Sequence, residues 1–97
     1  MKAVFVSCNQ SMFENILTIM DDMNLRGFTG WEELIGRGSN DGEPHLGSHA
    51  WPSMNSALIA VMKDDQATEF IKQIKKLDDE NHTQGIKAFA WEVSDAF

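Results

Sequence analysis

KAVFVS, residues 2–7, and SALIAVM, residues 56–62, are the two stretches of this 97-residue chain that decide its fold. In both runs neighbouring positions are apolar, and not only alternate ones. This pattern is typical of strands that are buried on both faces, and such strands occupy the middle of a sheet. We therefore expect these two segments to be the central strands of the fold.

The segments around the two runs alternate between helix and strand patterns. Apolar side chains recur at helical spacing in residues 12–24 and again in the segment that begins at Asp64 or Asp65. Residues 28–35 and 86–93 have the composition of two further strands. The order βαββαβ predicts an α+β fold of the ferredoxin-like kind, and right-handed crossovers then give the sheet order 4-1-3-2.

Local signals predict where the two helices begin. Ser11, followed three residues later by Glu14, matches the capping box of a helix N-terminus. Asp64 or Asp65 is expected to cap the second helix, and the polar residues 78–85 are expected to form the turn after it.

Both helices of a ferredoxin-like fold cover the same face of the sheet. A lone chain would then expose the other face to water, and its central strands would alternate between apolar and polar residues. The central strands of this chain do not alternate. We therefore expect further copies of the chain to bury the open face in a closed homo-oligomer.

A long polar loop, residues 36–55, connects the second and third predicted strands. It reads GRGSNDGEPHLGSHAWPSMN and contains four of the seven glycines and both prolines of the chain. Loops of this length are usually functional or disordered. Trp51 and Pro52 near its end are expected to anchor the return of the chain into the third strand. The function is therefore expected on or beside this loop.

We expect residues 1–97 to form a single domain. The composition of the chain disfavours several classes of function. Eight basic and fifteen acidic residues give a net charge of −7 without a basic cluster, which disfavours nucleic-acid binding. The sequence predicts no membrane insertion and no secretory signal, so we expect a cytoplasmic protein. The one cysteine, Cys8, excludes an intrachain disulfide and is expected to be a structural thiol. No nucleophile–base signature is apparent, so an enzyme is not expected.

The chain resembles PII-like signalling proteins, relatives of the nitrogen regulatory protein P-II, over nearly its whole length. The second strand begins with a Gly-hydrophobic-Thr step, the long loop opens with Gly-x-Gly, and a glycine and a lysine precede an aromatic residue in the last strand. These motifs are Gly27-Phe28-Thr29, Gly36-Arg37-Gly38 and Gly85-Ile86-Lys87-Ala88-Phe89. Typical relatives continue the Gly-x-Gly with Arg-Gln, whereas this chain has Ser39 and Asn40.

The resemblance implies a homotrimer that senses a small effector in the clefts between its subunits. Typical relatives bind an adenine nucleotide, with 2-oxoglutarate as a second ligand, and regulate a partner protein, such as a membrane transporter or an enzyme, through the long loop 36–55. The implied effector-binding residues are Gly27, Phe28, Thr29, Gly36, Arg37, Gly38, Gly85 and Lys87. The alternative role of Arg37 is a salt bridge to Glu32, to Glu33 or to a neighbouring subunit.

A second hypothesis is a transition-metal-binding or metal-tolerance protein. His45 and His49 lie four residues apart in the long loop, with Asp41 and Glu43 upstream. Imidazole and carboxylate groups together suit zinc, copper or nickel. Pro44 argues against a helix that would place both imidazoles on one face, so the spacing alone does not decide between the two functions.

Overall fold

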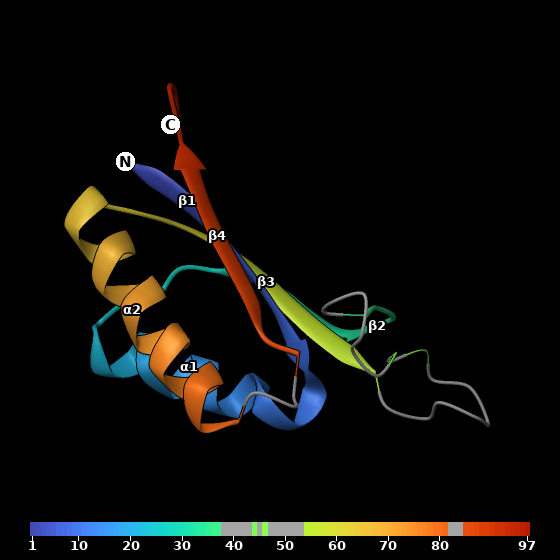
Figure 1. Cartoon of the computed structure of the whole chain (residues 1–97). Coiled ribbons are helices and arrows are strands. Elements are labelled where there is room, and N and C mark those ends of the chain that lie inside the picture. The colour runs from blue at the N-terminus through green and yellow to red at the C-terminus, as the bar shows by residue number, and fades with distance from the viewer. Residues whose placement is uncertain (38–43, 45, 47–53, 82–84) are drawn as a thin grey trace.

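Two helices and a four-stranded sheet make up the fold, which a computed structural model describes for residues 1–37, 44, 46, 54–81 and 85–97 (Figure 1). The elements, in chain order, are β1 (Lys2–Asn9), the 3₁₀ turn η1 (Gln10–Met12), α1 (Phe13–Asp22), β2 (Thr29–Leu34), β3 (Asn55–Met62), α2 (Asp64–Glu80) and β4 (Lys87–Glu92). This is the predicted βαββαβ order.

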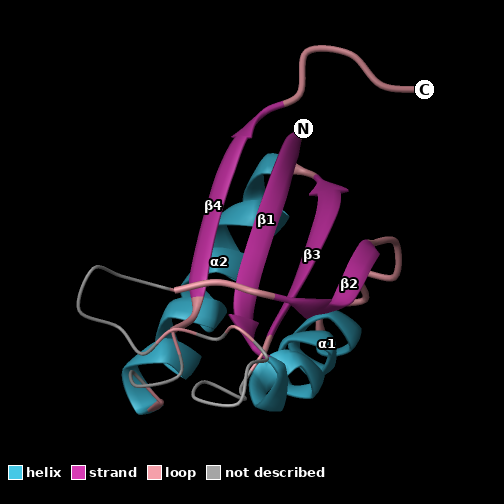
Figure 2. Cartoon of the chain, turned by 90° about the vertical axis from the view of Figure 1, so that its right-hand side faces the viewer, coloured by secondary structure: helices cyan, strands magenta, loops and turns pink. Residues whose placement is uncertain are grey.

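The sheet has the order β2-β3-β1-β4, which is the predicted order 4-1-3-2 read from the other edge. All three neighbouring pairs are antiparallel. Figure 2 shows the four strands in this order with both helices behind them. The two runs that are apolar on both faces form β1 and β3, the two central strands, so the prediction of the fold class is confirmed.

The core lies between the sheet and the helix layer. Val4, Val6 and Cys8 of β1 point to the same side as Leu58 and Ala60 of β3, and all five are at most 4% exposed. The helices contribute one apolar stripe each to this core, with buried Ile16 and Met20 from α1 and buried Ala67, Phe70 and Ile74 from α2. The apolar side chains that recur with the 3.6-residue period of the helices therefore pack in one layer against those that recur with the two-residue period of the strands.

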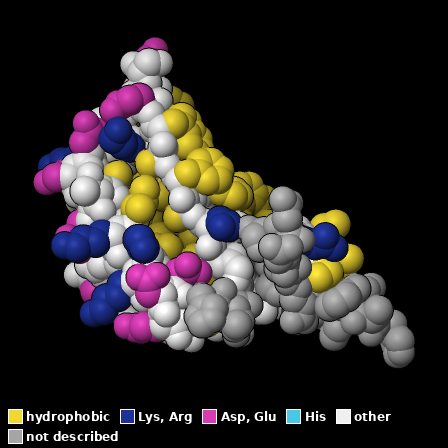
Figure 3. Space-filling view, viewed as in Figure 1, with side chains coloured by type: hydrophobic (Ala, Val, Ile, Leu, Met, Phe, Trp, Pro, Cys, Tyr) yellow, Lys and Arg dark blue, Asp and Glu magenta, His cyan; other side chains and the backbone are white. Residues whose placement is uncertain are grey.

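The opposite face of the sheet is also apolar, and we call it the open face. Phe5 lies at its centre, paired with Ile59 on one side and Phe89 on the other. The rings of Phe5 and Phe89 have centroids 5.4 Å apart. Phe89 and Val61 are 54% and 51% exposed, and Figure 3 shows apolar side chains along the sheet on the side away from the helices. The absence of alternation in the central strands therefore reflects a second apolar surface.

The predicted helix caps are wrong in both cases. Asn9, and not Ser11, is the N-cap of η1, and its Oδ1 accepts a hydrogen bond of 3.0 Å from the backbone amide of Ser11. Lys63, and not an aspartate, precedes α2, and its backbone amide donates to Oε1 of Gln66. In each case the N-cap residue lies one or two residues before the polar side chain that matched the pattern.

The second helix also continues to Glu80, beyond the start of the predicted turn at residue 78. The Nζ atom of Lys75 lies 3.6 Å from a carboxylate oxygen of Asp79, one helical turn later. Such a pair stabilises an exposed helix end by a few tenths of a kcal/mol, which helps the helix to continue through the polar residues.

The single thiol, Cys8, lies within β1 and not after it, and its side chain is fully buried. Burial raises the pKa of Cys8 to about 11 by desolvating the thiolate.

Because the thiolate is the reactive form, we expect disulfide-exchange reagents to modify Cys8 at pH 8 on the order of a hundredfold more slowly in the folded chain than in urea. The matched control is the thiol introduced by Ser94→Cys in a Cys8→Ala background, since Ser94 is exposed. Equal rates for the two thiols in the folded state would contradict this account.

Candidate functional site

A pocket of about 240 Å³ lies at the end of the sheet where the long loop leaves β2. Its apolar wall comes from Phe5, Leu34, Ile35 and Ala57, and its polar residues are Ser7, Gly36, Arg37, Asn55 and Lys87. The four strands contribute together because the register brings their residues into one row. Ser7 pairs with Ala57 on one side and with Lys87 on the other.

The pocket is basic although the chain as a whole carries a net charge of −7. Arg37 and Lys87 line it, and no carboxylate does. Within the part of the chain that the structure describes, neither cation is in an ion pair, so the alternative salt bridge from Arg37 to Glu32 or Glu33 does not form. A planar guanidinium and a mobile ammonium beside one cavity are the groups that bind phosphate and carboxylate.

Gly36 brings the backbone close to the polar wall of the pocket. A Cβ atom at this position would lie 2.5 Å from Nδ2 of Asn55, a separation that real side chains do not tolerate. Asn55 is 7% exposed and cannot move freely away. A larger residue before Arg37 would therefore have to displace the amide group of Asn55, which gives a physical reason for the first glycine of the Gly-x-Gly motif.

The structure brings together only part of the predicted effector-binding set. Gly36, Arg37 and Lys87 share the pocket, and Gly85, which has a φ of 69°, lies two residues before Lys87. Gly38 lies outside the described residues. Sequence reasoning did not identify Ser7 and Asn55, because only the strand register shows that they face the same cavity.

The other predicted motif, Gly27-Phe28-Thr29, lies at the opposite end of β2. Thr29 pairs with Ile59, whereas Leu34 beside the pocket pairs with Asn55. Their partners in β3 are four positions apart, which corresponds to about 13 Å along an extended strand. Within one chain, the motif Gly27-Phe28-Thr29 therefore does not line the pocket that Gly36, Arg37 and Lys87 share.

The predicted metal ligands His45 and His49 lie outside the described residues, so the metal hypothesis stays a prediction. Among residues 1–37, 44, 46, 54–81 and 85–97, no three His, Cys, Asp or Glu side chains form a group that could hold a metal ion. In the same residues, no helix is long and apolar enough to cross a membrane.

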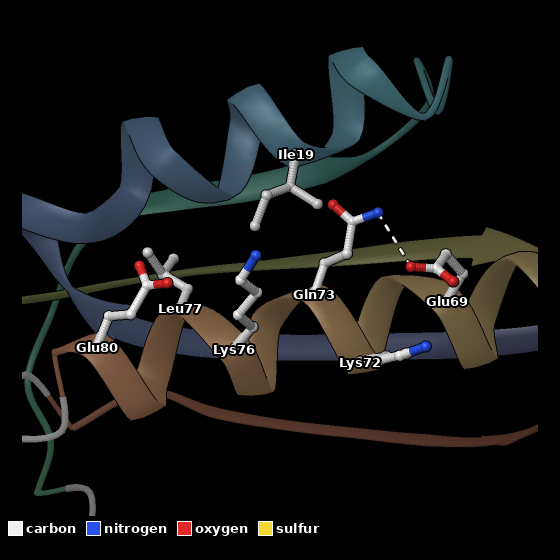
Figure 4. A pocket seen from close by; sticks show the side chains of 7 residues that line it. All are labelled: Ile19, Glu69, Lys72, Gln73, Lys76, Leu77 and Glu80. Carbon is white, nitrogen blue, oxygen red and sulfur yellow. Dashed lines mark hydrogen bonds between the residues drawn. The ribbon is translucent and has the colours of Figure 1, made fainter.

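A larger groove of about 510 Å³ lies on the helix layer, between α1 and α2 (Figure 4). Ile19 and Leu77 supply its apolar part, and the remaining lining residues are Glu69, Lys72, Gln73, Lys76 and Glu80. Two lysines and two glutamates leave it without net charge, and none of the predicted site residues lines it. We therefore place the candidate site in the smaller basic pocket at the base of the long loop.

No protein-family model matches this sequence, and no curated protein is significantly similar to it. Solved structures, in contrast, match almost the whole chain. A PII-like signalling protein from Thermus thermophilus is 14% identical, with a TM-score of 0.68 over 95% of this chain and 85% of its own.

The nitrogen regulatory PII-like protein CPII from Thiomonas intermedia, bound to ADP, AMP and bicarbonate, is 16% identical. Its TM-score is 0.70 over 97% of this chain and 88% of its own. The apo form of CPII matches with 13% identity and a TM-score of 0.67, over 95% of this chain and 89% of its own. At these identities the similarity lies in the fold. The chain therefore has the fold of the PII-like signalling proteins, as its sequence motifs implied.

Proposed function

We propose that this protein is a PII-like regulator, and not an enzyme, that binds an adenine nucleotide through the basic pocket at the base of its long loop. The observation that carries this proposal is the pairing of Arg37 and Lys87 beside one cavity in an acidic chain. The PII-like fold supports it, and so does the similarity to CPII, which has been seen with ADP and AMP.

The pocket suits the phosphates of the nucleotide better than the whole molecule. Pockets for drug-sized ligands usually have volumes of roughly 300–1,000 Å³, and this one has about 240 Å³ within a single chain. Arg37 and Lys87 would bind the phosphate oxygens, and the backbone at Gly36 and Gly38 would approach them closely. Gly85 would shape the turn that leads to Lys87.

The remainder of the nucleotide would lie against a second copy of the chain. Gly27, Phe28 and Thr29 do not line the pocket of their own subunit. In a homotrimer, closed around the open faces of three sheets, a neighbouring subunit would supply this motif. The exposed aromatic residues Phe89 and Trp91 would then be buried at the subunit interface.

The ligand would regulate a partner protein through the loop 36–55. Gly36 and Arg37 are the first residues of this loop and also line the pocket. An anion bound by Arg37 would therefore bias the conformation of the segment that follows it, as in switches that order a loop around a phosphate. A membrane transporter or an enzyme remains the expected class of partner, and the cytoplasm remains the expected location.

Calorimetric titration with ADP and AMP tests the nucleotide site. We expect wild-type protein to bind, and Arg37→Ala and Lys87→Ala each to weaken binding roughly tenfold to hundredfold, since a hydrogen bond to a charged group contributes about 1.5–3 kcal/mol. Lys76→Ala is the matched control, because Lys76 lies in the groove between α1 and α2. The absence of nucleotide binding by the wild-type protein would refute the proposal. Equal binding by Arg37→Ala and the control would refute the site.

Light scattering after size exclusion tests the trimer. We expect a mass of about three times that of the 10.9 kDa chain. Phe89→Asp should produce monomers, because it would bury a carboxylate without a partner in the interface. Gln73→Asp adds the same group to α2 and should leave the mass unchanged. A monomeric wild-type protein, or a trimer that tolerates Phe89→Asp, would show that the open face is not the interface.

A further inference from the structure

Strand β2 contains a bulge immediately before the pocket. Trp31 pairs with Ala57 and Leu34 pairs with Asn55, and the register shifts between these two pairs. Glu32 and Glu33 therefore lie opposite Ser56 alone, so β2 has one residue more than its partner strand. A bulge of this kind changes which face of the sheet the following side chains point to.

The bulge determines that the start of the long loop faces the pocket. Residues directly opposite each other in an antiparallel pair share a face, so Leu34 lies on the same face as Asn55, which is the open face. In a regular strand, residue 33 would take this place and Leu34 would point to the helix layer. The extra residue therefore turns Leu34 and, two residues later, Gly36 toward the cavity that both of them line.

Two side chains hold the carbonyl group that the bulge displaces. The carbonyl oxygen of Glu32 accepts a hydrogen bond of 2.7 Å from Nε2 of Gln10 and another of 2.7 Å from Oγ of Ser56. Ser56 is 2% exposed, whereas Gln10 is exposed. A bulge locally disrupts the ladder, and these two donors provide hydrogen bonds for the carbonyl group of Glu32.

Gln10 also contacts the other end of the long loop. Its backbone amide donates a hydrogen bond of 3.0 Å to the carbonyl oxygen of Met54, the residue before β3. One residue, in the short turn after β1, is therefore bonded to both stems of the loop. Its side chain holds the outgoing stem and its backbone holds the returning stem.

We propose that Gln10 is a positioning residue for the pocket. By holding the bulge at Glu32, it keeps Gly36 and Arg37 turned toward the ligand, and by bonding Met54 it closes the base of the loop. This inference deepens the proposed function, because it treats the pocket as the anion site. Its structural part, the control of the loop base by Gln10, is measurable without any ligand.

The variant Gln10→Met tests the side chain alone. Methionine has nearly the same length and keeps the backbone amide, but it has no hydrogen-bond donor. The matched control is Gln73→Met, since Gln73 is a half-buried glutamine on α2, away from the pocket, whose Nε2 donates an exposed hydrogen bond of 3.1 Å to Glu69. Ser56→Ala removes the second donor to the same carbonyl and provides an independent variant.

We expect amide hydrogen exchange in residues 34–37 to be roughly twofold to tenfold faster in Gln10→Met, which is the equilibrium effect of losing one exposed hydrogen bond. ADP affinity should fall by a similar factor, and the thermal midpoint should shift no more than in Gln73→Met. Ser56→Ala should accelerate exchange in the same residues.

Unchanged exchange at residues 34–37 in both Gln10→Met and Ser56→Ala would overturn the inference, even if the wild-type protein binds ADP. Faster exchange with unchanged ADP affinity would also overturn it, because Gln10 would then not act on the pocket. A wild-type protein that binds no ADP, with exchange still faster in the variants, would refute the proposed ligand and leave the control of the loop base by Gln10 supported.

Discussion

The rest of this structure depends on one constraint, which is that β1 and β3 are apolar on both faces. Helices α1 and α2 cover only one of these faces. On the other, Phe5, Ile59 and Phe89 form a continuous surface, and Phe89 at its edge is half exposed. A chain of this size gains little stability from a single core layer, so a second covered layer would add substantially to its stability. Assembly around the open face would therefore be part of how this fold is stabilised, and not only part of its function.

The architecture could be predicted from the sequence because it depends on hydrophobic periodicity. The runs at residues 2–7 and 56–62 identified the central strands, and the crossover rule then determined the order of all four. The helix starts could not be predicted in the same way. Ser11 matched a capping pattern, but Asn9 took the cap position because the chain turns through η1 first. Several polar residues near a helix start can act as the cap, and the path of the chain decides between them.

The candidate site was predictable only where a short motif marks it. Arg37 directly follows Gly36, and Lys87 lies two residues after Gly85, so these basic residues beside glycines are visible in the sequence. Ser7 and Asn55 became apparent only from the register, which depends on tertiary pairing. The bulge at Glu32 was a further obstacle, since it reverses the faces of all later residues in β2. An alternation read through residues 31–36 would have assigned Leu34 and Gly36 to the helix side.

The position of the pocket would link ligand binding, subunit assembly and the conformation of the long loop, which would otherwise be independent. Arg37 belongs to the loop and Lys87 belongs to an edge strand. In the proposed trimer, Gly27, Phe28 and Thr29 would approach them from another subunit. A ligand that contacts all three groups would bind the assembled trimer better than the separate chains, and by linkage it would stabilise the assembly. The same ligand would favour the loop conformation that keeps Arg37 in place, so partner binding and ligand binding would affect each other equally. Regulation would thus follow from the geometry of a site that is divided between a loop and two subunits, without any catalytic group.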